Sequence, residues 1–351
     1  MTLPITRRKI RIGLVGCGHI SRNHLAAVEN NADDVELVAA CDPNADAVAA
    51  VVEKTGARAF ASLDDMLAQT ELDVVALATP TGLHREQTER AAAAGCHVLT
   101  EKPMATTWSD GRAMVRACDE AGVRLFVIKP MRFHPVMRAL KDAIDRGRFG
   151  DIYMVNATMF WTRPQEYYDR GGGWRGTWVM DGGALMNQAS HLVDLLYWFL
   201  GPLRRVQAFA GTLARNIEAE DSIVLNLEWQ RGTLGAMAVT MLTWPKNLEA
   251  TLTIIGEKGT VQLAGNGANE VRHWEFAEPE PVDEEMRTGA FQHVSAGGFG
   301  HTLCYENMIA TLRGAGEPLV DGHEGLKSLE FIIAAYRSAR ERAPVTLPLE
   351  G

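Results

Sequence analysis

The chain has 351 residues, which is long for a single hydrophobic core, so the sequence predicts two domains. Hydrophobic residues make up 46% of it and charged residues 23%, and these values exclude a disordered or fibrous protein. The 44 acidic and 35 basic residues give a formal net charge of −9, which disfavours general binding to nucleic acid or to an anionic membrane.

The sequence has no pattern typical of a metal site, a disulfide framework or a membrane protein. Its five cysteines form no Cys-x-x-Cys pair and stand in apolar segments, so we expect reduced thiols and a cytoplasmic protein. His84 and His273 lack neighbours in the sequence that would complete a metal site. The start of the chain has no apolar core and no apolar run reaches about 18 residues, so we expect neither a signal peptide nor a membrane span.

Residues 1–128 alternate short apolar strands with helical patterns. Strands are predicted in "KIRIGLVG", "VELVAACD", "DVVALATP", "HVLTEKP" and "RLFVI", with helices near residues 19–31, 44–55, 83–94 and 107–121. Fully apolar strands that alternate with helices indicate a parallel sheet covered on both faces. Right-handed crossovers make such a sheet doubly wound, so the sequence predicts an α/β domain here.

Residues 129–351 are predicted to form a second domain. A helix near residues 133–147, a strand in "DIYMVNATMFW" and a loop rich in glycine and tryptophan precede a helix in residues 181–196. Five strand-like runs with short turns follow between residues 205 and 275, and they indicate a mostly antiparallel sheet. Residues 278–298, rich in acids and prolines, are expected to be a mobile surface loop. Helices near residues 301–313 and 325–341 close the chain, and the last can dock back on the first domain.

The motif "VGCGHIS" stands between the first strand and the first helix. In a dinucleotide-binding turn, the first glycine permits the sharp bend and the second lets a pyrophosphate approach the helix N-terminus. The third position of the fingerprint is Ser21, which is small enough to permit close packing. Asp42 ends the second strand, where a carboxylate binds ribose hydroxyls and repels the 2′-phosphate of NADP, so NAD is the predicted cofactor. The predicted cofactor-binding residues here are Gly16, Gly18, His19, Ile20 and Asp42; a plain turn with a helix-capping aspartate is the alternative.

Two further strand–helix junctions, Thr79-Pro80 and Glu101-Lys102-Pro103, are expected at the carboxyl edge of the sheet, where ligands bind in open α/β folds. A lysine between a glutamate and a proline is unusual for a surface lysine, although a solvated turn charge is the alternative. We expect this edge to contact the cofactor through Thr79, Pro80, His84, Glu101 and Lys102.

The helix predicted in residues 181–196 carries Asn187, His191 and Asp194 along one side and leucines on the adjoining face. The preceding "DGG" supplies a capping aspartate and two flexible residues, so the first turn can approach a ligand closely. We expect Asp194 to anchor the helix. A buried structural histidine is the alternative interpretation of His191.

Other residues of the second domain are candidates for substrate contacts. Arg132 in "KPMRFHP" can pair with a substrate carboxylate, and Tyr167 or Tyr168 can contact a sugar or a uracil. Trp174 and Arg175 stand in the glycine-rich loop, with core packing and a surface charge as the alternatives.

The sequence resembles the glucose–fructose oxidoreductase/inositol dehydrogenase family in "VGCGHIS", "TPTGLH…GCHVLTEKPMA", "GGALMNQASHLVDL" and "DGHEGLKSLEFIIAAYRSA", which span nearly the whole chain. The resemblance implies an N-terminal Rossmann domain that binds NAD. It also implies a C-terminal α+β domain for substrate, whose open, mostly antiparallel sheet commonly forms an oligomer interface. Lys102 is then expected beside the nicotinamide, in contact with the substrate hydroxyl, and Trp174 and Arg175 are expected to border the nicotinamide side.

Three stretches look like the UDP-N-acetyl-2-amino-2-deoxyglucuronate dehydrogenases: "WRGTWVMDGGALMNQASHLVDLL", "GTLARNIEAEDS" and "TMLTWPKNLEATLTIIGEKGTV". This likeness implies that NAD oxidises the C3 hydroxyl of a UDP-sugar, for bacterial surface-polysaccharide (O-antigen) synthesis. The broader family usually has an aspartate where this chain has Asn187, and an amide cannot relay a proton. We therefore expect His191 to be the general base, Lys102 to stabilise the reacting oxygen and Asn187 to orient the sugar hydroxyls.

The sequence leaves several alternatives open. They are a dehydrogenase of another sugar or polyol, an NAD-dependent glycosidase, and a dinucleotide-sensing regulator, although intact Lys102 and His191 argue against the regulator. NADH is either released or reoxidised in place by a second substrate such as a 2-oxo acid. We expect a homo-oligomer, either a dimer or a tetramer.

Overall fold

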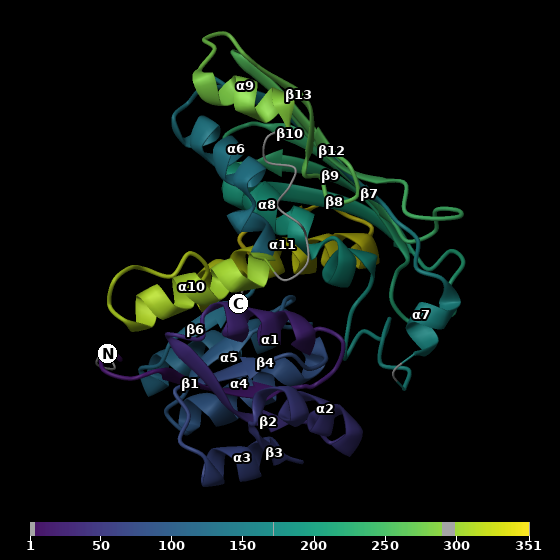
Figure 1. Ribbon diagram of the computed structural model, residues 1–351. Coiled ribbons are helices and arrows are strands. Elements are labelled where there is room, and N and C mark those ends of the chain that lie inside the picture. Colours follow the sequence, from purple (N-terminus) through teal and green to yellow (C-terminus); the bar gives the residue numbers. More distant parts are fainter. Residues whose placement is uncertain (1–3, 171, 290–298, 351) are drawn as a thin grey trace. The chain divides into compact units, whose positions relative to one another are not determined.

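The computed structural model describes residues 4–170, 172–289 and 299–350 (Figure 1). The chain forms two compact units: unit 1 consists of Met1–Pro130 and Ala296–Leu329, and unit 2 of Met131–Ser295 and Glu330–Gly351. The predicted division after residue 128 gave residues 129–351 to one domain. The structure instead returns a later segment to unit 1, because residues far apart along the chain complete one core.

Unit 1 is built on a six-stranded parallel sheet of order β3-β2-β1-β4-β5-β6, which confirms the predicted doubly wound α/β domain (Figure 1). Its strands are β1 (Ile10–Val15), β2 (Val35–Cys41), β3 (Arg58–Phe60), β4 (Val74–Leu77), β5 (His97–Thr100) and β6 (Leu125–Val127). Its helical elements are α1 (Ser21–Asn30), α2 (Ala45–Thr55), α3 (Leu63–Gln69), η1 (Thr81–Leu83), α4 (His84–Ala93), α5 (Trp108–Ala121), α10 (Phe299–Leu312) and the first part of α11 (Gly322–Glu341). The strand order reverses between β1 and β4, and dinucleotides bind at such switch points.

Local sequence signals begin and end several of these helices. The side chains of Asn44, Ser62 and Thr107 accept hydrogen bonds from backbone N–H groups in the first turns of α2, α3 and α5. Helices α2 and α5 end at Gly56 and Gly122, both in the left-handed conformation that glycine adopts most readily. Strands β4 and β5 are buried throughout, as a sheet covered on both faces requires.

Unit 2 is built on an eight-stranded sheet of order β13-β12-β11-β7-β10-β9-β8-β14. Strand β7 runs parallel to β10, and the other pairs are antiparallel, which confirms the predicted mostly antiparallel sheet. The strands are β7 (Ile152–Phe160), β8 (Leu203–Gly211), β9 (Ser222–Trp229), β10 (Leu234–Thr240), β11 (Glu249–Gly256), β12 (Gly259–Ala264), β13 (Glu270–Phe276) and β14 (Val345–Thr346). The helical elements are η2 (Pro130–Phe133) at the boundary, α6 (Pro135–Asp145), α7 (Gln165–Asp169), η3 (Ala184–Gln188), α8 (Ser190–Leu200), α9 (Pro281–Thr288) and the end of α11.

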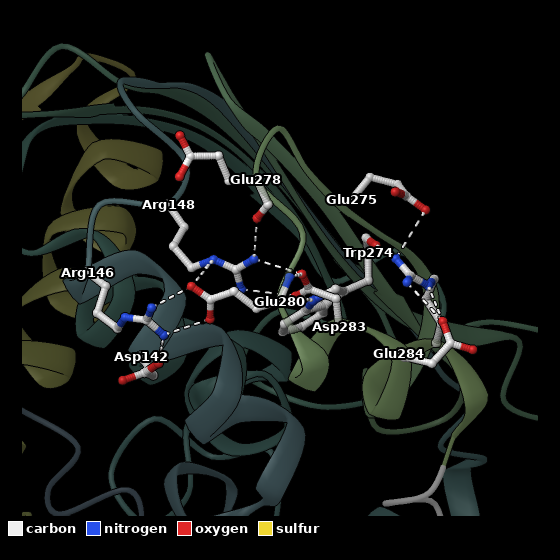
Figure 2. Close-up of polar contacts among 10 residues, drawn as sticks. Asp142, Arg146, Arg148, Trp274, Glu275, Glu278, Glu280, Asp283 and Glu284 are labelled. Atoms are coloured by element: carbon white, nitrogen blue, oxygen red, sulfur yellow. Dashed lines mark hydrogen bonds and ion pairs between the residues drawn. The ribbon is translucent and has the colours of Figure 1, made fainter.

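Part of the segment predicted as a mobile acidic loop is a helix, α9. It begins with a capping box between Glu280 and Asp283. Figure 2 shows the Arg148 guanidinium directed at these acids: it donates to both Asp283 oxygens at 2.7 and 2.9 Å, while Trp274 Nε1 donates to Asp283 Oδ1 at 2.7 Å. The prediction was wrong for residues 281–288 because acidic composition suggested solvation, whereas Asp283 is 1% exposed and paired with Arg148. Residues 290–298 lie outside the described part of the chain.

Candidate active site

The glycine-rich turn after β1 has the geometry of a phosphate-binding turn. Gly16 has a φ of +94°, and a Cβ there would lie 2.6 Å from the backbone oxygen of Ala78, so only glycine fits. A Cβ on Gly18 would meet nothing within 4 Å, which leaves space for a ligand beside the backbone. Ser21 donates from Oγ to the Gly18 carbonyl at 2.6 Å. This serine therefore closes the turn, although the usual fingerprint has glycine at its position.

Two predicted cofactor residues stand where the turn enters α1. Ile20 is the N-cap residue of α1, and His19 precedes it. The first N–H groups of a helix lack intrahelical partners and attract an anion such as a pyrophosphate. The location of both residues is therefore compatible with the predicted contact.

Asp42, after β2, is held against the glycine-rich turn. Its Oδ2 accepts a hydrogen bond from the Cys17 backbone N–H at 2.8 Å, and its Oδ1 accepts one from the Asn44 N–H at 2.8 Å. A carboxylate oxygen can accept two hydrogen bonds, so each Asp42 oxygen can still accept one from a ribose hydroxyl. The contact with Cys17 gives Asp42 a bracing role that its position in the sequence did not show.

His84 joins the two remaining strand–helix junctions of unit 1. It is 1% exposed, with Nδ1 3.1 Å from the Pro103 carbonyl oxygen and Nε2 3.0 Å from the Thr79 carbonyl oxygen. Burial lowers the pKa of this imidazole, against the effect of these carbonyls and of Glu101. Both ring nitrogens face the interior of unit 1. The ring thus links the Thr79 and Pro103 turns, and the contact of His84 with the cofactor stays a prediction.

Glu101 belongs to a buried polar cluster that the sequence analysis missed. His301 Nε2 lies 2.7 Å from Glu101 Oε1, and His24 Nε2 lies 3.4 Å from the same oxygen. Tyr305 completes the cluster, with its hydroxyl 2.9 Å from His24 Nδ1. The other Glu101 oxygen, Oε2, accepts the Lys102 backbone N–H at 3.1 Å. His24 is in α1, while His301 and Tyr305 are in α10, so neither spacing nor a motif in the sequence indicated their contact.

In unit 2, the segment predicted as one helix is interrupted by a π-helical turn. The turn η3 contains Asn187, and α8 begins at Ser190 and contains the half-buried His191. The prediction of one continuous α-helical face for both residues was therefore wrong. Such π turns occur frequently at functional sites.

Long-range contacts hold this turn. The Ala184 N–H donates to the Glu220 carbonyl at 2.9 Å, and the Leu185 N–H donates to Glu220 Oε1 at 2.8 Å. The Met186 N–H donates to the Tyr336 hydroxyl at 3.0 Å. A Cβ at Gly183 would lie 1.7 Å from Glu220 Oε2, so glycine is required beside this carboxylate. The π turn could not be predicted from the sequence, because its hydrogen-bond partners are distant along the chain: Glu220 lies just before β9 and Tyr336 lies in α11.

Asn187 is oriented by Asp181. The Asn187 amide donates from Nδ2 to Asp181 Oδ1, and Asp181 Oδ2 accepts the Gly176 N–H at 2.8 Å. Asn187 Oδ1 in turn accepts from Gln188 Nε2 at 3.2 Å. Asp181 is 2% exposed, so the predicted capping aspartate serves instead as a buried acceptor that fixes the amide.

Arg132 and Asp194 form a buried ion pair. Arg132 donates from Nε and Nη2 to the two Asp194 oxygens at 2.8 and 2.9 Å, and both residues are 1% exposed. These two donor groups are directed at Asp194, and the pairing of Arg132 with a substrate carboxylate stays a prediction. The expected anchoring role of Asp194 agrees with the pair.

The glycine-rich loop brings its cations against aromatic rings. The Arg175 guanidinium carbon lies 4.9 Å from the ring centre of Tyr167 and 4.7 Å from that of Trp174. The Tyr167 hydroxyl accepts a hydrogen bond from Gln188 Nε2 at 3.1 Å, which connects this loop to η3. Tyr168 is 7% exposed, so the half-buried Tyr167 is better placed than Tyr168 to contact a substrate.

The structure thus groups the predicted residues by unit. Unit 1 contains the glycine-rich turn, Asp42, the Thr79-Pro80 junction and Lys102; unit 2 contains Asn187, His191, Trp174 and Arg175. The partnership of Lys102 with His191 joins residues of different units and stays a prediction.

Comparison with known proteins gives matches along both units. The NAD-binding Rossmann fold of the Gfo/Idh/MocA oxidoreductase family matches residues 10–129, and the C-terminal alpha/beta domain of that family matches residues 141–347. A structure of the WlbA dehydrogenase from Bordetella pertussis, in complex with NADH and UDP-GlcNAcA, is 55% identical, with a TM-score of 0.96 over 99% of this chain and 100% of that one. A structure of the WlbA dehydrogenase from Chromobacterium violaceum, with the same two ligands, is 56% identical, with a TM-score of 0.95 over 100% of this chain and 99% of that one.

A curated relative is more distant: D-apiose dehydrogenase from Paraburkholderia graminis is 29% identical over 97% of this chain and 91% of its own length. The family matches confirm the predicted Rossmann domain and its NAD cofactor. This chain belongs to the Gfo/Idh/MocA oxidoreductase family.

Proposed function

We propose that this protein oxidises the C3 hydroxyl of UDP-N-acetyl-2-amino-2-deoxy-D-glucuronate to the 3-keto sugar, with NAD as hydride acceptor. One observation carries the proposal: identity of 55% over 99% of the chain with a dehydrogenase whose structure holds NADH and UDP-GlcNAcA. The more distant D-apiose dehydrogenase supports sugar oxidation in general but not this substrate.

Residues of unit 1 hold the dinucleotide in this proposal. The open space at Gly18 and the N-terminus of α1 suit the pyrophosphate, and the braced carboxylate of Asp42 suits the ribose hydroxyls. NAD, when bound, supplies the hydride acceptor. The Lys102 ammonium donates a hydrogen bond to the reacting oxygen and stabilises its developing negative charge.

Residues of unit 2 handle the sugar. His191 removes the proton of the C3 hydroxyl as the general base. Asn187, whose amide is fixed by Asp181, orients the sugar hydroxyls and takes no proton. Trp174 and Arg175 border the nicotinamide side, and Tyr167 is the aromatic residue we assign to the substrate.

Mass spectrometry tests the reaction directly. The protein, incubated with NAD and UDP-N-acetylglucosaminuronate, should yield NADH and a UDP-sugar that has lost two hydrogens. A cleaved glycoside would favour an NAD-dependent glycosidase, and an unchanged sugar would refute the proposal. If turnover needs an added 2-oxo acid while NADH stays bound, the cofactor is recycled in place.

Two variants test the acid–base roles. His191→Ala should lower kcat by roughly 100-fold or more at neutral pH with little change in KM, as loss of a general base does. Lys102→Ala should lose most activity and retain NAD binding in calorimetry. Near-normal turnover of His191→Ala would assign the base elsewhere.

We also propose a cytoplasmic homo-oligomer that serves surface-polysaccharide synthesis. Five apolar side chains, each at least 40% exposed, lie on one face of the unit 2 sheet: Met154, Phe209, Val224, Leu234 and Ile255. Met154 pairs in register with both Leu234 and Ile255, and Phe209 pairs with Val224, so the apolar surface crosses five strands. Within the described residues, every helix is too short or too polar to cross a bilayer. Light scattering after size-exclusion chromatography should give a dimer or tetramer, and Leu234→Glu should shift it toward the monomer.

A further inference from the structure

The polar cluster around Glu101 connects three elements of unit 1 to the turn that carries Lys102. Glu101, His24, His301 and Tyr305 are each at most 6% exposed. Their contacts join α1, α10 and the turn after β5. A buried carboxylate is costly unless its oxygens are hydrogen-bonded, so these partners stabilise the charge of Glu101.

The protons of the cluster have one favourable arrangement. Glu101 Oε1 faces the Nε2 atoms of both histidines, so each Nε2 carries a proton as donor. The Tyr305 hydroxyl then donates to His24 Nδ1, which fixes His24 as the neutral Nε2–H tautomer. The 2.7 Å contact of His301 is a strong hydrogen bond, whereas the 3.4 Å contact of His24 is an electrostatic one, since His24 Nε2 has no hydrogen-bond partner among the described residues.

Charge and burial act in opposite directions on these groups. Burial alone would raise the pKa of Glu101, but the contacts with His24 and His301 outweigh it and hold that pKa well below its usual value. Burial lowers the pKa of His24, which agrees with a neutral ring. Glu101 therefore remains a carboxylate at neutral pH, with Oε1 bound by the histidines and Oε2 directed at the Lys102 N–H.

Two histidines and a glutamate are also a ligand set for zinc, and their nearest ligand atoms lie within 4.8 Å of one another. The separations favour hydrogen bonding instead. The distance of 2.7 Å between His301 Nε2 and Glu101 Oε1 is that of a direct hydrogen bond, and Tyr305 faces the opposite ring nitrogen of His24. Bound metal is therefore an outcome of the test below and not the proposal.

We propose that His301, supported by His24, is a positioning residue for Lys102: it fixes Glu101, and Glu101 fixes the backbone of Lys102. This inference rests on the proposed role of Lys102 at the reacting oxygen. Misplacement of a catalytic group by about 1 Å can cost about 100-fold in rate, so a brace on this turn has a catalytic consequence.

The test compares His301→Leu, which removes the donor, with His301→Gln, whose amide can donate to the same carboxylate. His301→Leu should lower kcat roughly 10- to 100-fold, with KM for the sugar and Kd for NAD within about 3-fold of wild type. His301→Gln should recover most of that loss. Asn30→Ala is the matched control, because Asn30 joins α1 to α10 through Thr302 at 3.0 Å without contacting Glu101, and it should leave kcat unchanged.

A second measurement does not depend on the substrate. Hydrogen exchange of the Lys102 amide, followed by mass spectrometry on the NAD-bound protein, should accelerate at least about 10-fold in His301→Leu and not in His301→Gln or Asn30→Ala. Unchanged exchange together with wild-type kcat would overturn the inference, as would stoichiometric zinc in the purified protein or equal loss of kcat and NAD affinity. If wild type fails to oxidise the sugar but the exchange pattern holds, the proposed function fails while the brace on Lys102 stands.

Discussion

Glu220 should make the protein less stable as the pH rises toward neutrality. The residue is 3% exposed; its Oε1 accepts hydrogen bonds from the Leu185 N–H at 2.8 Å and the Tyr336 hydroxyl at 2.9 Å. Its Oε2 is buried and has no hydrogen-bond partner among the described residues. Burial is the largest effect on this group and raises its pKa from 4.5 to about 7, although the two donors oppose the change.

The sign follows from proton binding. In the unfolded chain Glu220 loses its proton near pH 4.5, whereas in the folded chain it keeps the proton to about pH 7. Between these values the folded state binds more protons, so the free energy of unfolding falls as the pH rises. The difference in pKa corresponds to about 3 kcal/mol, lost progressively between pH 4.5 and about 7 and fully absent above it.

Glu220→Gln keeps an oxygen acceptor for Leu185 and Tyr336 and removes the titration. We therefore compare the free energy of unfolding of the variant with that of wild type at each pH. The difference, variant minus wild type, should increase by about 3 kcal/mol between pH 4.5 and pH 8, whatever its value at acid pH. Urea unfolding at several pH values measures this difference, and Glu166→Gln, on the exposed surface of α7, is the control. A difference between Glu220→Gln and wild type that does not change with pH would refute the reasoning.

Three further changes test the polar contacts of unit 2. Arg132→Met should cost about 3–5 kcal/mol in urea unfolding, because it removes the guanidinium that pairs with the buried Asp194 carboxylate, and adding Asp194→Leu should recover most of that loss. Asp283→Asn should lower the free energy of unfolding by about 2 kcal/mol at pH 7. Burial raises the pKa of Asp283, but the contact with Arg148 outweighs burial and lowers that pKa from 3.8 to about 2. The cost of the substitution should therefore vanish as the pH falls through this range. Asn187→Asp should lower both stability and kcat, since it places a second carboxylate against Asp181. The double variant with Asp181→Asn should recover part of the lost kcat. A fully active Asn187→Asp would contradict the role we assign to the amide.

The two sheets could be predicted because their signals are local and repeated. Strands β4 and β5 are continuous apolar runs, and in β9 buried Ile223, Leu225 and Leu227 alternate with more exposed residues. Each pattern follows directly from which faces of the sheet are covered. The glycine-rich turn was predictable from a short local motif. The structure agrees with the motif, because a side chain at Gly16 would collide with the backbone of Ala78.

The surroundings of the candidate site could not be predicted, because they depend on tertiary contacts. The helical spacing of Asn187 and His191 favoured one α-helix. In the structure, oxygen atoms of Glu220 and Tyr336 accept hydrogen bonds from backbone N–H groups of the π turn and so stabilise it. Arg132 was predicted as a substrate contact, and nothing in its sequence spacing indicated the buried ion pair with Asp194. Composition was also misleading at α9, where the acidic segment packs because the half-buried Arg148 pairs with the buried Asp283.

The contacts of Asn187 sharpen the proposed chemistry. In a site with aspartate at this position, a second carboxylate is available to carry a proton away from the reacting hydroxyl. Here the amide donates to a buried carboxylate and accepts from Gln188, so both of its ends hold fixed hydrogen bonds and its orientation is set. An amide takes no proton under these conditions, and Asp181 is 2% exposed behind it. On the proposed assignment, the proton leaves the sugar through His191, and the pH dependence of kcat should report this imidazole and not a pair of carboxylates.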